Sequence, residues 1–98
     1  MRVPKSLSLL RRMRDARLRR LRRLGAMIRG SLVVFPGHSS RYLTDKVEGK
    51  TRTLYVPLGH LKEVQAWNKT YREARRLLTE LSELQRAILR REIEQEKA

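Results

Sequence analysis

Residues 41–57, RYLTDKVEGKTRTLYVP, have the pattern of a β-hairpin. β-branched and aromatic residues form two runs, and between them lies Glu48-Gly49, a pair that suits a tight turn because glycine takes positive φ readily. Pro57 then ends the second run because it cannot donate a hydrogen bond to a sheet. This stretch therefore predicts two antiparallel strands joined by a short loop.

A two-residue loop also fixes which side chains share a face of the hairpin. It places Asp45 opposite Arg52, Leu43 opposite Leu54 and Val47 opposite Lys50 on one face. The other face carries Tyr42, Thr44, Lys46, Thr51, Thr53 and Tyr55. An isolated hairpin is marginally stable in water, so we expect it to share a core with the segments on each side.

On the N-terminal side, residues 1–4 form a short leader and residues 5–29 predict a basic helix that ends at Gly30. A narrow apolar seam follows heptad spacing through Leu7, Leu10, Leu21, Leu24 and Ile28. Arg14 and Arg17 interrupt the middle of this seam. The remaining circumference is the guanidinium face, made of Arg11, Arg12, Arg19, Arg20, Arg22 and Arg23.

Residues 31–56 predict a β-meander. The apolar run 31–35 is a short strand, and residues 36–40 are the loop that connects it to the hairpin. The antiparallel sheet has two strands if this strand stays apart and three if it pairs with the hairpin. On the C-terminal side, residues 58–96 predict a long helix with an apolar stripe that includes Trp67, which we expect to pack rather than to stack on bases.

The predicted fold is α+β, with residues 1–98 as a single small domain. The long helix exceeds the size of such a domain, so it either folds back on the first helix as a helical hairpin or forms a coiled-coil dimer with a second copy. No apolar run approaches the ~20 residues that a membrane crossing requires. Disulfides and thiolate metal sites are excluded because the chain has no cysteine.

Positive charge is concentrated at the N-terminus. The chain has 24 lysines and arginines against 10 acids, a net charge of +14, and residues 1–29 alone carry +10 with Asp15 as their single acid. Such a field opposes folding unless a polyanion neutralises it, which favours nucleic acid as the partner. A solvated helix, an organellar transit peptide and a basic membrane-surface helix remain alternative interpretations of the same stretch.

One string in the sequence resembles a known family. R-G-S-L at residues 29–32, followed by Y-L-T-x-K-V-x-G-K-T-x-T-x-Y-V-P at residues 42–57, is similar to small, largely uncharacterised prokaryotic proteins, many of them associated with mobile elements. The resemblance covers roughly residues 20–90. Members often carry a cysteine-rich knuckle where this sequence has only residues 35–41, so a metal role does not transfer. The resemblance implies work near transposon nucleic acid and no established activity.

No catalytic constellation is visible. Nucleophile-elbow, phosphate-loop and metalloprotease motifs are absent, and Asp45 and Glu48 are explained as a cross-strand partner and a turn residue. His38 and His60 are read as surface histidines, although their spacing leaves a two-histidine metal site open. We therefore expect no enzyme activity, no metal and no cofactor.

These observations predict a cytoplasmic, non-catalytic nucleic-acid-binding accessory protein, a homodimer or a subunit of a larger complex such as a ribonucleoprotein, with no membrane partner. The guanidinium face is expected to bind phosphates of DNA or RNA. A second contact is expected at the hairpin tip, through Lys46, Lys50, Thr51 and Arg52. The sequence shows no exposed aromatic platform, which disfavours sequence-specific recognition of a single strand. The alternative is an adaptor whose long helix docks on a larger effector or transposase.

Overall fold

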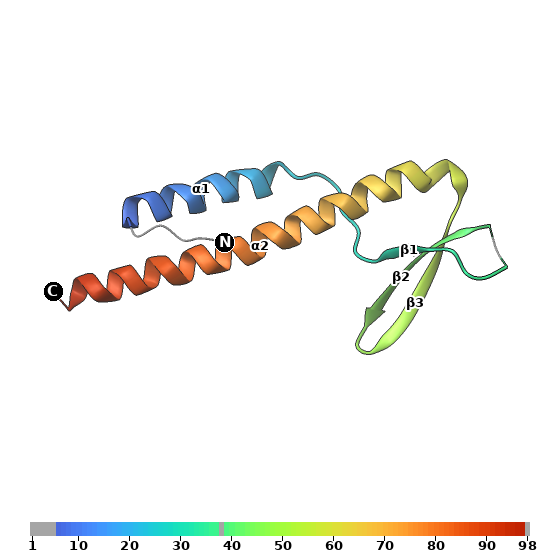
Figure 1. Cartoon of the computed structure of the whole chain (residues 1–98). Coiled ribbons are helices and arrows are strands. Elements are labelled where there is room, and N and C mark those ends of the chain that lie inside the picture. Colours follow the sequence, from blue (N-terminus) through green and yellow to red (C-terminus); the bar gives the residue numbers. More distant parts are fainter. Residues whose placement is uncertain (1–5, 38, 98) are drawn as a thin grey trace. The chain divides into compact units, whose positions relative to one another are not determined.

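The computed structural model describes residues 6–37 and 39–97 and confirms the α+β prediction (Figure 1). Its elements are α1 (Leu7–Arg23), β1 (Ser31–Val33), β2 (Arg41–Val47), β3 (Lys50–Val56), the 3₁₀ turn η1 (Leu58–His60) and α2 (Leu61–Glu96). The predicted leader at residues 1–4, the predicted first helical residue Lys5, and His38 lie outside the described residues.

The chain divides into two compact units. The helical unit combines residues up to Leu24 with those from Ala74 onward, and the sheet unit comprises Gly25–Glu73. α2 contributes its C-terminal part to the helical unit and its N-terminal part to the sheet unit. That residues 1–98 fold as a single domain stays a prediction.

In the helical unit, α1 packs antiparallel against the C-terminal part of α2 (Figure 1). Leu10 of α1 is fully buried with Leu84 and Ile88 of α2. The direction follows from the contacts, because Arg11 lies near Glu92 whereas Arg17 lies near Glu80. The long helix thus folds back on the first one, and a coiled coil with a second copy stays a prediction.

The arginines that interrupt the apolar seam of α1 are half-buried against α2. Arg14 donates to the Oε1 atom of Gln85 at 3.4 Å, and Arg17 lies 3.5 Å from the Oε1 atom of Glu80. Polar pairs at seam positions fix helix register, because a slipped register would leave them without partners. Arg14 and Arg17 therefore set the pairing of α1 with α2.

The sheet unit is a three-stranded antiparallel meander in the order β1-β2-β3. Its register confirms the predicted hairpin, with Asp45 opposite Arg52 and Leu43 opposite Leu54. One face packs on α2 through a core of Leu43, Val56 and Val64, and four partly buried side chains complete that core: Ile28, Leu32, Leu61 and Trp67. The prediction that Trp67 packs is thereby confirmed, and its place is the core of the sheet unit.

The hairpin turn uses positive φ at both of its central residues. Glu48 has φ +52° and Gly49 has φ +80°, the backbone of a type I′ turn. The sequence indicated positive φ for glycine alone. Glu48 adopts it because this turn matches the twist of the flanking strands, which pair from Val47↔Lys50 to Arg41↔Val56.

The first helix is shorter than predicted, since it ends at Arg23 rather than Arg29. Leu24 leaves the helix with an extended backbone. Ile28 then serves the sheet unit: it packs on the second core, and its N–H donates to the carbonyl of Trp67 at 3.1 Å. Burial in that core overrides the helical spacing of Ile28, because an extended segment is needed to reach the sheet.

Gly30 does not cap a helix but lies directly before β1. Its φ is +136°, and a β-carbon at this position would lie 2.8 Å from the carbonyl oxygen of Thr44. Asn68 of α2 holds the same segment by donating from Nδ2 to the carbonyls of Ile28, at 3.2 Å, and Gly30, at 2.7 Å. β1 ends at Val33 rather than at the predicted Phe35, and the long helix begins with the 3₁₀ turn η1.

Candidate nucleic-acid interface

The guanidinium face lies on the exposed side of α1. Ser6 caps the helix, with its Oγ accepting a hydrogen bond from the N–H of Leu9. All six arginines of the face are exposed. Arg11 lies 4.0 Å from the Oε2 atom of Glu92, with both side chains about half exposed (47% and 45%). An exposed pair at this distance leaves Arg11 largely available to another anion.

Four arginines of this face have no hydrogen bond or ion pair within residues 6–37 and 39–97: Arg12, Arg19, Arg22 and Arg23. Arg12, Arg19 and Arg23 follow a spacing of seven and four residues. At 3.6 residues per turn this spacing places them on one side of the helix, ~10.5 Å and ~6 Å apart along its axis. They form a row of cations opposite the buried Leu10.

The nearby carboxylates are engaged by other arginines. Asp15, the acid of α1, accepts from Nε of Arg14 at 3.0 Å. Glu80 of α2 binds Arg17 at 3.5 Å and Arg76 at 3.0 Å. Arg14, Arg17 and Arg76 thus bind these acids, and the row of Arg12, Arg19 and Arg23 stays available to solvent or to a partner.

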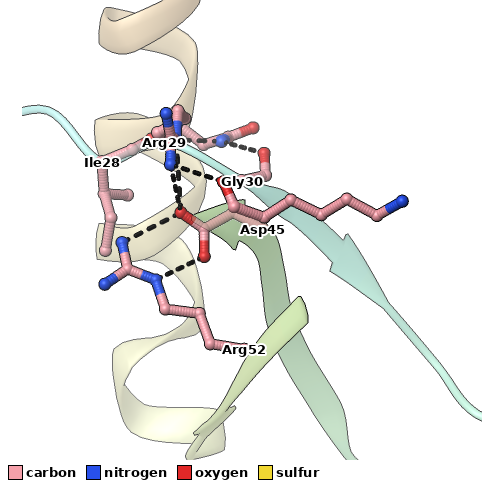
Figure 2. Close-up of polar contacts among 7 residues, drawn as sticks. Ile28, Arg29, Gly30, Asp45 and Arg52 are labelled. Carbon is pink, nitrogen blue, oxygen red and sulfur yellow. Dashed lines mark hydrogen bonds and ion pairs between the residues drawn. The ribbon is translucent and has the colours of Figure 1, made fainter. Parts of the chain in front are cut away.

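The hairpin carries a second group of cations, and one of them is already bound. Arg52 donates to Asp45 from Nε at 2.6 Å and from Nη2 at 3.0 Å, which confirms the predicted cross-strand pair. Arg29 donates to Asp45 at 3.1 Å and to the carbonyl of Lys46 at 2.9 Å. Figure 2 shows Asp45 held between the two guanidinium groups. Arg29 could not be predicted as a partner of Asp45, because its place here depends on the segment that follows α1.

Hydrogen bonds and charge explain how Asp45 titrates. The pKa of Asp45 is held below its ordinary value mainly by the hydrogen bond from Arg52, and Arg29 adds to the effect although partial burial opposes it. The same pair raises the pKa of Arg52. Asp45 is therefore ionised at neutral pH and ties β2 to β3 and to the segment before β1.

The other predicted residues of the hairpin tip stay exposed. Lys46, Lys50 and Thr51 are solvent-accessible, and neither lysine forms an ion pair within the described part of the chain. They do not share a face, because Lys46 and Thr51 pair on one side of the hairpin and Lys50 and Arg52 lie on the other. The tip offers isolated lysines to a partner rather than a continuous cationic patch.

The expectation that no aromatic platform is exposed is wrong. The face of the sheet away from α2, here called the open face, carries Ser31, Val33, Tyr42, Thr44, Lys46, Thr51, Thr53 and Tyr55. Tyr42 lies directly opposite Tyr55, with ring centroids 5.7 Å apart, and Phe35 lies 5.1 Å from Tyr42 on the other side. We call these three rings the aromatic row.

The sequence predicted part of the aromatic row. The predicted register already placed Tyr42 and Tyr55 on one face. Phe35 could not be added, because its position depends on the register of β1 against β2, where Val33 pairs with Tyr42. A five-residue loop does not fix that register in the way a two-residue turn does.

Within residues 6–37 and 39–97 no three His, Cys, Asp or Glu side chains are grouped so that they could hold a metal ion. His60 lies 3.2 Å from Glu63, and His38, the other histidine considered as a ligand, falls outside these residues. Across the same residues, no helix has the length and apolar character needed to cross a membrane.

Comparisons of the chain with protein families, with curated proteins and with solved structures find no match. The assignment of a function therefore rests on the residues and their geometry.

Proposed function

We propose that the chain is a non-catalytic nucleic-acid-binding accessory protein that contacts phosphates through the guanidinium face of α1. The supporting observation is the row of Arg12, Arg19 and Arg23, which is exposed and has no partner within the described residues, while nearby acids bind other arginines. Each phosphate neutralised by such a side chain releases counterions, and this release gives affinity without sequence preference.

The hairpin tip supplies the second contact of this proposal. Lys46, Lys50 and Thr51 are exposed at the end of a two-stranded ribbon, a shape that fits the major groove of DNA. Arg52, also predicted there, already forms an ion pair with Asp45. To bind a phosphate it must either contact both anions at once or give up Asp45. We therefore assign most of the hairpin contact to the two lysines.

The setting of this activity is inferred from the sequence. The resemblance of residues 29–32 and 42–57 to proteins of mobile elements supports a role beside transposon nucleic acid or in a ribonucleoprotein, in the cytoplasm. An arginine-rich helix suits either DNA or RNA, because both present regularly spaced phosphates.

Binding to α1 is tested by a charge-matched pair of variants. Arg19, Arg22 and Arg23 changed together to Gln should weaken binding of a labelled duplex at least tenfold in a fluorescence-anisotropy titration at 50 mM salt. The control changes Arg75, Arg86 and Arg90 to Gln, which removes the same charge from exposed positions of α2. Equal losses in the two variants would show that net charge, and not this face, carries the binding.

A second candidate function is supported by apolar side chains on α2. Leu78 and Leu89 are each 57% exposed and Ile93 is 42% exposed. Their spacing of eleven and four residues places them on one side of the helix, away from Leu84 and Ile88, which face α1. This stripe suits a partner helix, either in a homodimer or in an adaptor that docks on a larger protein.

Light scattering separates this candidate from the first. A homodimer that dissociates when Leu78, Leu89 and Ile93 are changed to Ser would assign the stripe to self-association. A monomer that also fails to bind any oligonucleotide would favour the adaptor and would contradict the nucleic-acid proposal.

A further inference from the structure

The open face of the sheet presents aromatic rings to solvent. Tyr55 is 53% exposed and Phe35 is 42% exposed, and both rings contact Tyr42, which lies between them and is half-buried. The core of this unit lies on the opposite face, where Leu43 and Val56 pack on Val64. The aromatic row is therefore no part of that core.

The chemistry around the row is polar and cationic. Hydroxyl groups of Ser31, Thr44, Thr51 and Thr53 surround it, Lys46 lies on the same face, and none of the strand residues on this face is an acid. An anion that approaches the open face therefore meets hydrogen-bond donors and one positive charge without a carboxylate to repel it.

We propose that the open face binds unpaired bases of a single-stranded nucleic acid, which stack on Tyr55 and Phe35 while Lys46 and the hydroxyl groups contact the backbone. Tyr42 is the positioning residue, because it contacts both of the exposed rings. This inference rests on the proposed function and adds an unpaired segment to its ligand, since a platform of rings reaches only bases that are not paired.

The size of the row argues against a second copy of the chain as the occupant. A large aromatic side chain has ~150–250 Å² to bury, so the exposed parts of Tyr55 and Phe35 together offer only about 200 Å². Stable protein interfaces bury roughly 800 Å² on each partner, and about 65% of a homodimer interface is apolar. Two exposed rings flanked by threonines fall far below that apolar area, whereas a base needs only one ring face.

The test uses an oligothymidylate and an abasic oligomer of the same length, which has the sugar-phosphate backbone without bases. Tyr55→Leu and Phe35→Leu should each weaken binding of the oligothymidylate about 5- to 150-fold, the range for loss of one base-ring stack. Binding of the abasic oligomer should be unchanged. Tyr55→Phe should retain most of the affinity because it keeps the ring.

Leu54→Ala is the matched control, because Leu54 is 60% exposed in the same strand but lies on the opposite face from Tyr55. It should bind both oligomers as the unaltered chain does. Circular dichroism of each variant checks that the sheet is intact, and a conservative Tyr55→Phe variant that loses affinity while remaining folded would overturn stacking as the mechanism.

The outcomes separate this inference from the proposed function. If the ring variants bind both oligomers normally while the α1 variant loses both, phosphate binding stands and the platform is refuted. If the α1 variant binds normally and the ring variants lose only the oligothymidylate, the platform stands and the guanidinium face is refuted. A change of mass in light scattering without any change in binding would assign the open face to self-association and overturn the inference.

Discussion

Gly30 is the position where a single added methyl group should disturb the sheet unit most. A β-carbon there would lie 2.8 Å from the carbonyl oxygen of Thr44 and 3.0 Å from Cδ1 of Leu43. The first neighbour is backbone within the ladder between β1 and β2, so it cannot move aside cheaply. The φ of +136° adds strain for any residue with a side chain.

These two effects set the magnitude for Gly30→Ala. Backbone strain of this kind costs ~1–3 kcal/mol, and forcing an extra carbon into a packed site costs a further ~1–3 kcal/mol. We therefore expect the free energy of unfolding to fall by about 2–6 kcal/mol. Small domains are stable by only ~5–15 kcal/mol, so the sheet unit should be severely weakened.

Two other glycines separate strain from collision. Gly49 has φ +80° with open space around its α-carbon, so Gly49→Ala should show strain alone, ~1–2 kcal/mol. Gly25 has open space and no positive φ, so Gly25→Ala should be neutral or stabilise by up to ~1 kcal/mol.

Urea unfolding followed by tryptophan fluorescence measures all three variants, because Trp67 is the only tryptophan and packs in the core of the sheet unit. Gly30→Ala should be the least stable variant. If Gly30→Ala loses no more stability than Gly49→Ala, the close approach of Gly30 to Thr44 does not exist and the placement of β1 is wrong.

Two further predictions concern single side chains. Because the pKa of Asp45 is lower in the folded than in the unfolded chain, its contribution to stability is present above its ordinary pKa of 3.8 and is lost as the pH falls through the folded value. The stability difference between the unaltered chain and Asp45→Asn, from urea unfolding across pH, should therefore shrink below about pH 4; a constant difference would contradict the pairing with Arg52 and Arg29. Leu84→Ala removes a fully buried side chain from the helical unit and should lower the free energy of unfolding by ~2–5 kcal/mol. Leu78→Ala changes a side chain that is 57% exposed on the same helix and should alter this free energy by less than ~1 kcal/mol. Unfolding followed by far-ultraviolet circular dichroism measures both variants.

The parts of the fold that short-range rules control were predictable. The hairpin register followed from the two-residue turn at Glu48-Gly49, and the pairing of Asp45 with Arg52 came with it. The long helix was visible because it has no glycine or proline between residues 60 and 96. In each case neighbouring residues alone decide the outcome.

The parts that depend on distant partners were not predictable. Ile28 has the right spacing to continue the first helix, and only the sheet core shows why the chain leaves the helix after Arg23. Arg14 and Arg17 interrupt the apolar seam in the sequence, and only the structure shows their partners in α2, Gln85 and Glu80. Long-range pairing decides these positions, and local propensity carries no information about it.

The candidate site also has a part that could be predicted from the sequence and a part that could not. The guanidinium face could be placed from helical periodicity, and its six arginines are exposed on α1. The aromatic row could not, because Phe35 joins Tyr42 only through the pairing of β1 with β2.

The salt dependence of duplex affinity tests the central claim most directly. Arg12, Arg19, Arg22 and Arg23 have no partner among the residues that the structure describes. If each of them neutralises one phosphate, the logarithm of affinity should fall with the logarithm of salt concentration with a slope of about −3.6. That slope corresponds to a loss of about 150-fold between 50 and 200 mM salt, and engagement of Arg11 and Arg20 as well would raise the loss to ~10³-fold. An affinity that does not change over this range would contradict phosphate binding by α1.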